Sequence, residues 1–380
     1  MYVMECCNLA INWMKWCLGL VWAIQALWFV PVAQASEVEG LYQAKVPVIS
    51  QTRDERLDIY PAALAQVVIK LSGDRNVPAL PELSAFMKRA NTLVQQFHYQ
   101  ELPPGNEALI EEGYKRLLVV SFDGKAVSQA LIESNVPLWG RTRPEVLLWL
   151  AIEDREARYL LASNASMELE SHLNDLAYQR GLTLILPLVD LEDQMQLEFA
   201  DVWGDFRQTI LQASQRYGVD AVLVGRLSRN KRGEWRNRWS LHYSADISTP
   251  SEFWQGEANT QAEALAVGVN GATDLIAQRY AQIFTAGAAD AVVLKVKAVN
   301  DLAGYARAME YLESLDIVTD VEVVKVMADE VLFKLAIRGD SYGLENAIML
   351  GNTLMKSSES TSYLDDGMIG ARAFVYQLLP

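Results

Sequence analysis

The stretch Val146-Leu147-Leu148-Trp149-Leu150-Ala151-Ile152 is a short, continuous apolar run, which is typical of a strand buried on both faces of a sheet. Two further apolar runs, 182–188 and 220–227, follow it along the chain. Amphipathic helices are expected between the runs, over 165–180 and 202–217, and each ends at a glycine suited to a helix C-terminus. This alternation predicts a sheet whose faces are covered by helices.

A hairpin with two different faces follows the third run. Residues 229–233 form its turn, and the strand after the turn alternates between aromatic and basic side chains. One face carries Trp235, Trp239, Leu241 and Tyr243, and the other carries Arg236 and Arg238. A strand at Phe253-Trp254 and an alanine-rich helix over 261–283 complete the order β-α-β-α-β-β-β-α, which predicts a mixed sheet.

Two further domains are expected on either side of this middle one. The segment 36–143 alternates strands (41–49, 97–102, 114–122) with helices (54–71, 83–94, 124–133), as in an α+β unit. Gly73 is expected to end the first of these helices and Asp123 to cap the last. From residue 287 the strands 292–299, 317–327, 331–338 and 371–379 and the helices 302–315 and 342–354 follow the βαββαβ order of a ferredoxin-like domain. We therefore predict an α/β and α+β protein with mixed sheets covered by helices and three domains: 36–143, 144–286 and 287–380.

The N-terminus has the layout of a secretory signal peptide. Residues 16–33 are almost wholly apolar, Lys15 precedes them, and Ala33-Gln34-Ala35 provides a cleavage site. An uncleaved membrane anchor is the alternative, because a span needs roughly 20 apolar residues. We expect residues 1–35 to be cleaved after Ala35, a periplasmic location and no membrane span in the mature chain. Met14 is the better start, since the residues before it include no basic side chain.

Composition narrows the function further. The three cysteines, Cys6, Cys7 and Cys17, precede the expected cleavage site, so the mature chain would have no disulfide, thiolate metal site or cysteine nucleophile. The net charge of −15 argues against nucleic acid as a partner, because phosphate binding needs local basicity.

A set of short motifs around the boundary of the first two domains carries a resemblance to a known family. Phe122-Asp123, a short helix, Pro137-Leu138-Trp139-Gly140, Arg143-Pro144 and Trp149-Leu150-Ala151 occur in fixed order. In this order they resemble the secreted proteobacterial family catalogued as domain of unknown function 2066. The resemblance covers the first two domains and implies an envelope location, but no activity and no functional residues.

A second resemblance covers part of the middle domain. The stretch from Tyr217-Gly218-Val219-Asp220 to Gly225, with Gly233-Glu234-Trp235, is similar to periplasmic α/β domains of the Tol translocation protein and of lipoprotein activators of cell-wall synthases. Those proteins bind other proteins and are not enzymes. This chain departs from the lipoproteins because no lipid-bearing cysteine follows its apolar stretch.

Catalytic motifs are missing from the sequence. His98, His172 and His242 lie far apart, and none stands at metal-ligand spacing. The sequence has no Gly-x-Ser-x-Gly elbow, phosphate-binding loop or dinucleotide fingerprint. We predict no catalytic residue, no metal and no cofactor.

Two sets of charged residues are candidate binding sites. A basic cluster surrounds the hairpin, and we predict binding of an acidic partner, a lipid phosphate or a cell-wall polymer by Arg226, Arg229, Arg236 and Arg238. An alternative acidic site follows predicted strand 182–188, where open α/β sheets often bind ligands, and consists of Asp190, Glu192 and Asp193.

Residues at the boundary of the first two domains have two interpretations. Two prolines and a glycine between Val136 and Pro144 break regular structure and mark the boundary. Trp139, Arg141 and Arg143 either wedge the two domains together or line a cleft between them.

These observations favour a periplasmic, non-enzymatic protein-binding or envelope-assembly factor whose partners are other envelope proteins. The alternative is a periplasmic hydrolase or small-ligand-binding protein with its site at the acidic strand ends. A chaperone-like protein that holds other exported chains is a third interpretation. The oligomeric state is left open.

Overall fold

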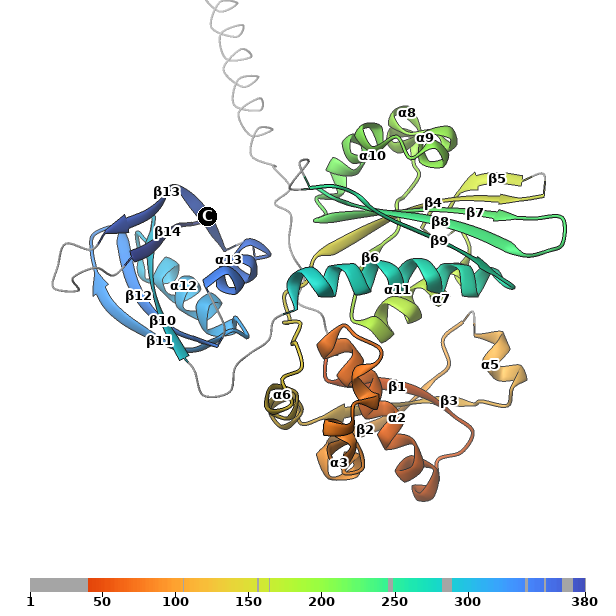
Figure 1. Ribbon diagram of the computed structural model, residues 1–380, viewed down its shortest axis with the longest axis horizontal. Helices are drawn as coiled ribbons and strands as arrows, with labels where there is room; N and C mark the ends of the chain where they lie inside the picture. The colour runs from red at the N-terminus through yellow and green to blue at the C-terminus, as the bar shows by residue number, and fades with distance from the viewer. Residues whose placement is uncertain are drawn as a thin grey trace, which may run out of the picture. The chain divides into compact units, whose positions relative to one another are not determined.

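The structure is a computed structural model (Figure 1). It describes residues 40–104, 106–155, 157–163, 165–244, 249–281, 289–338, 341–351, 353–363 and 372–379. The predicted signal peptide and all three cysteines lie outside the described residues. The described chain contains three sheets with helices packed on them, which confirms the predicted mixed α/β class. The division into three domains stays a prediction.

The middle sheet carries the candidate sites. Its strands run in the order β5-β4-β7-β8-β9, with β6 paired to one end of β4. β4 runs parallel to β6 and β7, and the other neighbours are antiparallel. The strands are β4 (Glu145–Asp154), β5 (Ala157–Leu160), β6 (Thr183–Ile185), β7 (Ala221–Arg229), β8 (Trp235–Tyr243) and β9 (Glu252–Ala258). The helices are α7 (Met167–Arg180), α8 (Leu191–Gln196), α9 (Phe199–Gly204), α10 (Arg207–Ser214) and α11 (Gln261–Tyr280), with a 3₁₀ turn at Gln215–Tyr217.

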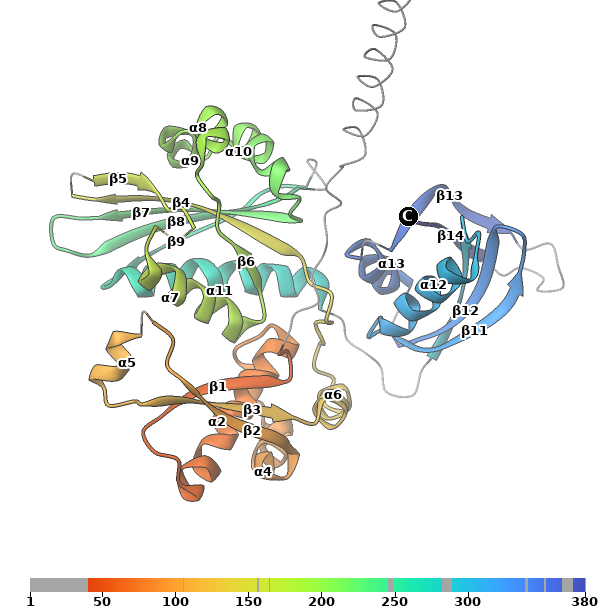
Figure 2. The same cartoon turned by 180° about the vertical axis from the view of Figure 1, so that it is seen from behind.

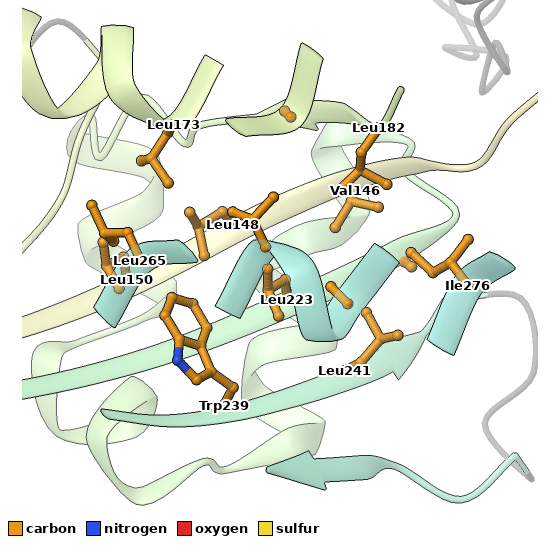
Figure 3. Packing of buried hydrophobic residues seen from close by; sticks show 14 of the residues in the cluster. Val146, Leu148, Leu150, Leu173, Leu182, Leu223, Trp239, Leu241, Leu265 and Ile276 are labelled. Carbon is orange, nitrogen blue, oxygen red and sulfur yellow. The ribbon is translucent and has the colours of Figure 1, made fainter. Parts of the chain in front are cut away.

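Helices cover the two faces of the middle sheet unequally. α7 and α11 lie along one face, while α8, α9 and α10 lie on the other and leave the strands near β5 and the β7–β8 turn uncovered (Figures 1 and 2). The face under α11 holds the larger core, where Trp239 is fully buried. Figure 3 shows its side chains, among them Leu148, Leu150, Leu223, Trp239, Leu241, Leu265 and Ile276.

The predicted helix over 202–217 is interrupted at Asp205, where the chain breaks between α9 and α10. That residue adopts a left-handed conformation with a φ of 55° between α9 and α10. Its carboxylate binds His242 and Arg226 from two strands. The predicted strand 182–188 is also shorter than expected, since only Thr183–Ile185 pairs with β4 before Asp190 caps α8. Local pattern could not show either feature, because both depend on contacts with distant segments.

The first sheet has the antiparallel order β1-β3-β2. Its strands are β1 (Gln43–Val48), β2 (Val94–Glu101) and β3 (Arg116–Phe122). Its helices are α2 (Arg53–Ser72), α3 (Ser84–Met87), α4 (Ala90–Leu93), α5 (Glu107–Glu111) and α6 (Gly124–Glu133), with 3₁₀ turns at Val77–Ala79 and Pro81–Leu83. Gly73 ends α2 and Asp123 caps α6, as predicted. The predicted helix 83–94 is replaced by the short pieces α3 and α4.

The C-terminal sheet has one strand more than the predicted ferredoxin-like pattern. Its elements are β10 (Ala289–Lys297), α12 (Leu302–Ser314), β11 (Val318–Val326), β12 (Glu330–Arg338), α13 (Ser341–Met349), β13 (Leu354–Tyr363) and β14 (Arg372–Leu378). The sheet order is β11-β12-β10-β14-β13. The predicted βαββαβ elements are all present, but the extra strand β13 makes β14 run parallel to β10. Within the described residues, no helix has both the length and the apolar character that crossing a bilayer requires.

Candidate functional site

Four arginines and three residues of β9 share the face of the middle sheet opposite α11. We call this set the arginine face, and it consists of Arg158, Arg226, Arg236, Arg238, Phe253, Gln255 and Glu257. Side chains alternate along β8, so Trp235 and Trp239 pack in the core while Arg236 and Arg238 point to the other side. The register places Arg238 beside both Arg226 of β7 and Gln255 of β9. This placement follows the predicted two-faced hairpin.

Carboxylates compensate part of the positive charge of the arginine face. Arg236 lies 3.1 Å from Glu257, and both side chains are about two-thirds exposed, at 65% and 66%. Arg158 lies 2.8 Å from Glu153. Arg238 is exposed and has no ion pair with any described side chain. The face therefore keeps a solvent-facing guanidinium that can bind an acceptor from outside.

Arg226 and Arg229 have different surroundings from the exposed Arg236 and Arg238. Arg226 is mostly buried and lies 3.4 Å from Asp205, and this burial lowers its pKa. Arg229 lies on the opposite face, 3.7 Å from Asp154 and over the ring of Trp235. The structure thus brings Arg226, Arg236 and Arg238 together but separates Arg229 from them.

A hydrogen-bonded chain of three polar residues lies beside the arginine face. His242 Nε2 is 3.0 Å from Asp205 Oδ1, and His242 Nδ1 is 2.7 Å from Ser251 Oγ. Burial raises the pKa of Asp205, but hydrogen bonding to His242 and the charge of Arg226 outweigh it and lower the pKa below its usual value. Sequence analysis missed this cluster because its members are brought together by the break at Asp205 and the β8–β9 connection.

The hydrogen bonds among Asp205, His242 and Ser251 hold neighbouring elements of the fold together. In serine hydrolases Nε2 faces the serine and Nδ1 faces the carboxylate, which is the reverse of the order found here. His242 is only 1% exposed, so its ring is shielded from solvent. The three residues tie α9, β8 and the start of β9 together.

The alternative acidic site forms an internal charge network. Arg216 lies 2.7 Å from Asp190 and 3.0 Å from Asp193, with Glu192 at 3.5 Å. The hydrogen bond with Arg216 lowers the pKa of Asp190 to about 2. Tyr217 donates its hydroxyl to Asp193 at 2.6 Å. Among the described residues, no group of three acidic, histidine or cysteine side chains is arranged to hold a metal ion.

Arg143 joins the first and middle sheets through main-chain carbonyls. Its guanidinium is fully buried and stacks on Trp139, 4.0 Å from the ring centre. Nη2 donates to Lys70 O at 2.7 Å and Trp139 O at 2.9 Å, Nη1 to Gly181 O at 2.7 Å, and Nε to Gly140 O at 2.9 Å. Lys70 and Gly181 stand at the C-terminal ends of α2 and α7, where helix carbonyls lack partners. Trp139 and Arg143 therefore lie where the ends of α2 and α7 meet, and the wedge role of these two residues stays a prediction.

Arg141 has a different role from Arg143. Its backbone N–H donates to Asp316 Oδ2 at 2.6 Å, and its exposed side chain lies 3.5 Å from the same carboxylate. Trp139, Gly140 and Arg141 also line a cavity of about 1240 Å³, together with parts of β1, β3 and α6 and with Asp316 and Arg338. The junction therefore also contributes to a cavity.

Two further buried basic side chains, those of Arg180 and Lys70, lie near the same helix ends. Arg180 donates to Gly73 O at 2.8 Å and forms an ion pair with Asp274 of α11. Lys70 is 1% exposed, donates to Gln43 O at 2.9 Å and lies 3.3 Å from the ring centre of Tyr178. Sequence analysis overlooked both residues, because a lysine or arginine near a helix C-terminus is normally a solvent-facing residue.

Lys70 is expected to make stability depend on pH. Burial lowers its pKa to about 6, and the charges of Arg143 and Lys45 add to this. The unfolded chain, with a lysine pKa of about 10.4, binds more protons than the folded chain above about pH 6, so stability should rise with pH by roughly 2 kcal/mol between about pH 6 and pH 8.

Urea unfolding at several pH values would measure this dependence. The substitution Lys70→Met should remove most of the slope, whereas Lys125→Met, at an exposed position, should leave it unchanged. An equal slope in the wild type and in Lys70→Met would refute the assignment.

The fold is that of a multi-sheet mixed α/β protein, and comparison with known proteins finds a matching family model for its first part. Residues 35–140 match the family described as Domain of unknown function (DUF8605). A solved structure, the LpoB C-terminal domain from Salmonella enterica, is 18% identical and covers 35% of this chain and 92% of its own, with a TM-score of 0.22. A similarity of this size carries no argument about function. No curated protein matches the sequence. The resemblance to family 2066 stays a prediction.

Proposed function

We propose that this protein is a non-enzymatic binding or assembly factor of the bacterial envelope and that the arginine face binds its protein partner. The observation that carries this proposal is that Arg238 is exposed on a sheet face that helices cover only in part, in a chain whose net charge is −15. Arginine and aromatic side chains are the residues that most often dominate protein interfaces. Phe253, which is 65% exposed on the same face, supplies the aromatic part.

An envelope location is part of the same proposal. It is supported by the signal-like layout of residues 1–35 and by the resemblance to a secreted proteobacterial family. The resemblance of residues 217–235 to periplasmic protein-binding domains supports a partner that is itself a protein.

The hydrolase or small-ligand alternative receives less support from the geometry. Asp190 and Asp193 are engaged by Arg216, which leaves these carboxylates poorly placed to act as a general base or to bind a cation. His242, which is hydrogen-bonded to Ser251, is buried. Its ring nitrogens face the serine and the carboxylate in the reverse of the catalytic order.

Charge reversal on the arginine face should abolish partner capture. In the double variant Arg236→Glu, Arg238→Glu we expect a loss of at least about tenfold in captured partner, because both substitutions repel an acidic surface. The expected change in stability is below about 1 kcal/mol, since both positions are exposed. In-cell cross-linking followed by mass spectrometry would measure capture.

The control changes the same charge at the turn of the same hairpin. The control variant is Lys231→Glu with Arg232→Glu, because both residues are exposed and lie beyond the sheet face. It should leave the partner set unchanged. An identical partner set for the face variant and the wild type would rule out the arginine face as the binding surface.

A further inference from the structure

The outer edge of β9 is open to a further strand. β9 ends the middle sheet and pairs with β8 along its whole length. Within the described chain, its main-chain groups have no hydrogen bonds outside that ladder. An edge of this kind presents a row of N–H and C=O groups that can pair with an extended segment.

The other edge strands in the described part of the protein carry features that hinder such pairing. Proline, short length and irregular register are the usual means by which proteins protect an edge. β1 contains Pro47, β5 is four residues long, and β6, which pairs only with β4, is three residues long. The remaining edges show register shifts: β2 between Val94 and Gln96, β11 between Val318 and Asp320 and between Val323 and Lys325, and β13 between Lys356 and Thr361.

β9 lacks these features. It is seven residues long, contains no proline or lysine, and keeps an unbroken register with β8. Its charged residues are Glu252 at its first position and Glu257, which pairs with Arg236. Among the described edges, β9 is therefore the one best suited to accept another strand.

We propose that β9 binds an extended, acidic segment of a partner protein as an added strand. The inference rests on the proposed function and names how the partner binds there. A residue opposite Gln255 on the added strand projects onto the arginine face, because side chains alternate and neighbouring strands lie about 4.8 Å apart. A glutamate at that position reaches toward Arg238, and an apolar residue opposite Phe253 packs on its exposed ring.

A second copy of this chain fits the edge less well. Glu257 of another copy is already paired with its own Arg236. Two chains that each carry a net charge of −15 also repel each other. A partner segment with free carboxylates avoids the first obstacle, because its carboxylates are available to pair with the exposed Arg238.

A short synthetic peptide tests the inference with the intact protein. The probe Thr-Val-Thr-Glu-Thr-Glu-Thr-Val-Thr reads the same in both directions, so strand orientation does not affect it. Fluorescence anisotropy would measure its binding, and we expect the peptide with lysine in place of glutamate to bind at least about tenfold more weakly.

Methylation of the peptide backbone distinguishes strand addition from other binding. Methyl groups on alternate amides block one edge of an extended peptide, and methyl groups on all amides block both edges. At least one alternate pattern should therefore retain binding, whichever strand orientation the peptide adopts, and the fully methylated peptide should lose it. The β9 amides should also exchange hydrogen more slowly when the peptide is bound. Retained binding of the fully methylated peptide, or no binding of the probe, would overturn the inference.

The failure of this inference can be told apart from failure of the proposed function. If Arg236→Glu with Arg238→Glu abolishes peptide binding while the wild type still binds the fully methylated peptide, the arginine face stands and strand addition falls. If the protein alone forms dimers that the peptide dissociates, a second copy occupies the edge and the partner assignment is overturned.

Discussion

Replacing Trp239 with alanine is expected to lower the free energy of unfolding by about 3–5 kcal/mol, as large-to-small changes of buried aromatic residues do. Trp239 is 0% exposed in the core between the middle sheet and α11. Its ring fills the space above two glycines, since a Cβ at Gly225 or Gly268 would overlap it. The surrounding backbone therefore cannot easily close the cavity that the alanine substitution would leave.

Urea unfolding followed by circular dichroism would measure this loss. Phe253→Ala is the matched control, because the ring is 65% exposed, and it should change stability by less than about 0.5 kcal/mol. A loss for Trp239→Ala below about 1 kcal/mol would contradict the packing described here.

The glycines that face Trp239 allow a stricter test. Gly268→Ala should cost about 1–3 kcal/mol alone, because the added methyl group overlaps the indole. In a Trp239→Leu background the same substitution should cost much less, since the overlapping atoms are gone. Additive effects would show that the two residues do not share this contact.

Replacing Arg143 with methionine is the second large expected effect, a loss of about 3 kcal/mol. Four main-chain carbonyls lose their donor. Two of them belong to the ends of α2 and α7, which pack on different sheets. Relief from burying the guanidinium offsets part of this loss, because burial lowers the pKa of Arg143 to about 9.

Unfolding curves and pH dependence together would check the role of Arg143. Arg141→Met should cost less than about 1 kcal/mol, because its side chain is half exposed. Arg143→Met should also weaken the pH dependence caused by Lys70, since the Arg143 charge helps to lower the pKa of that lysine. A variant as stable as the wild type would show that the carbonyls find other donors.

Local sequence patterns predicted the parts of the fold that depend on neighbouring residues. The buried strand at 146–152, the helix ends at Gly73 and Gly181 and the two-faced hairpin appear in the structure as expected. Each follows from periodicity or from backbone freedom at one position, which the sequence displays directly. The extra strand β13 escaped prediction because its first residues continue the apolar pattern of helix α13.

The sequence by itself determined that this protein has a mixed α/β fold and that Arg236 and Arg238 stand opposite a tryptophan face. Only the tertiary structure decided which charges are neutralised, because ion pairing and burial depend on residues distant in the chain. It separated Arg229 from the arginine face, buried Arg143 and Lys70 against helix ends, and engaged Asp190 and Asp193 with Arg216. It also left β9 as an unprotected edge, since strand order is set by long-range pairing and no local pattern encodes it.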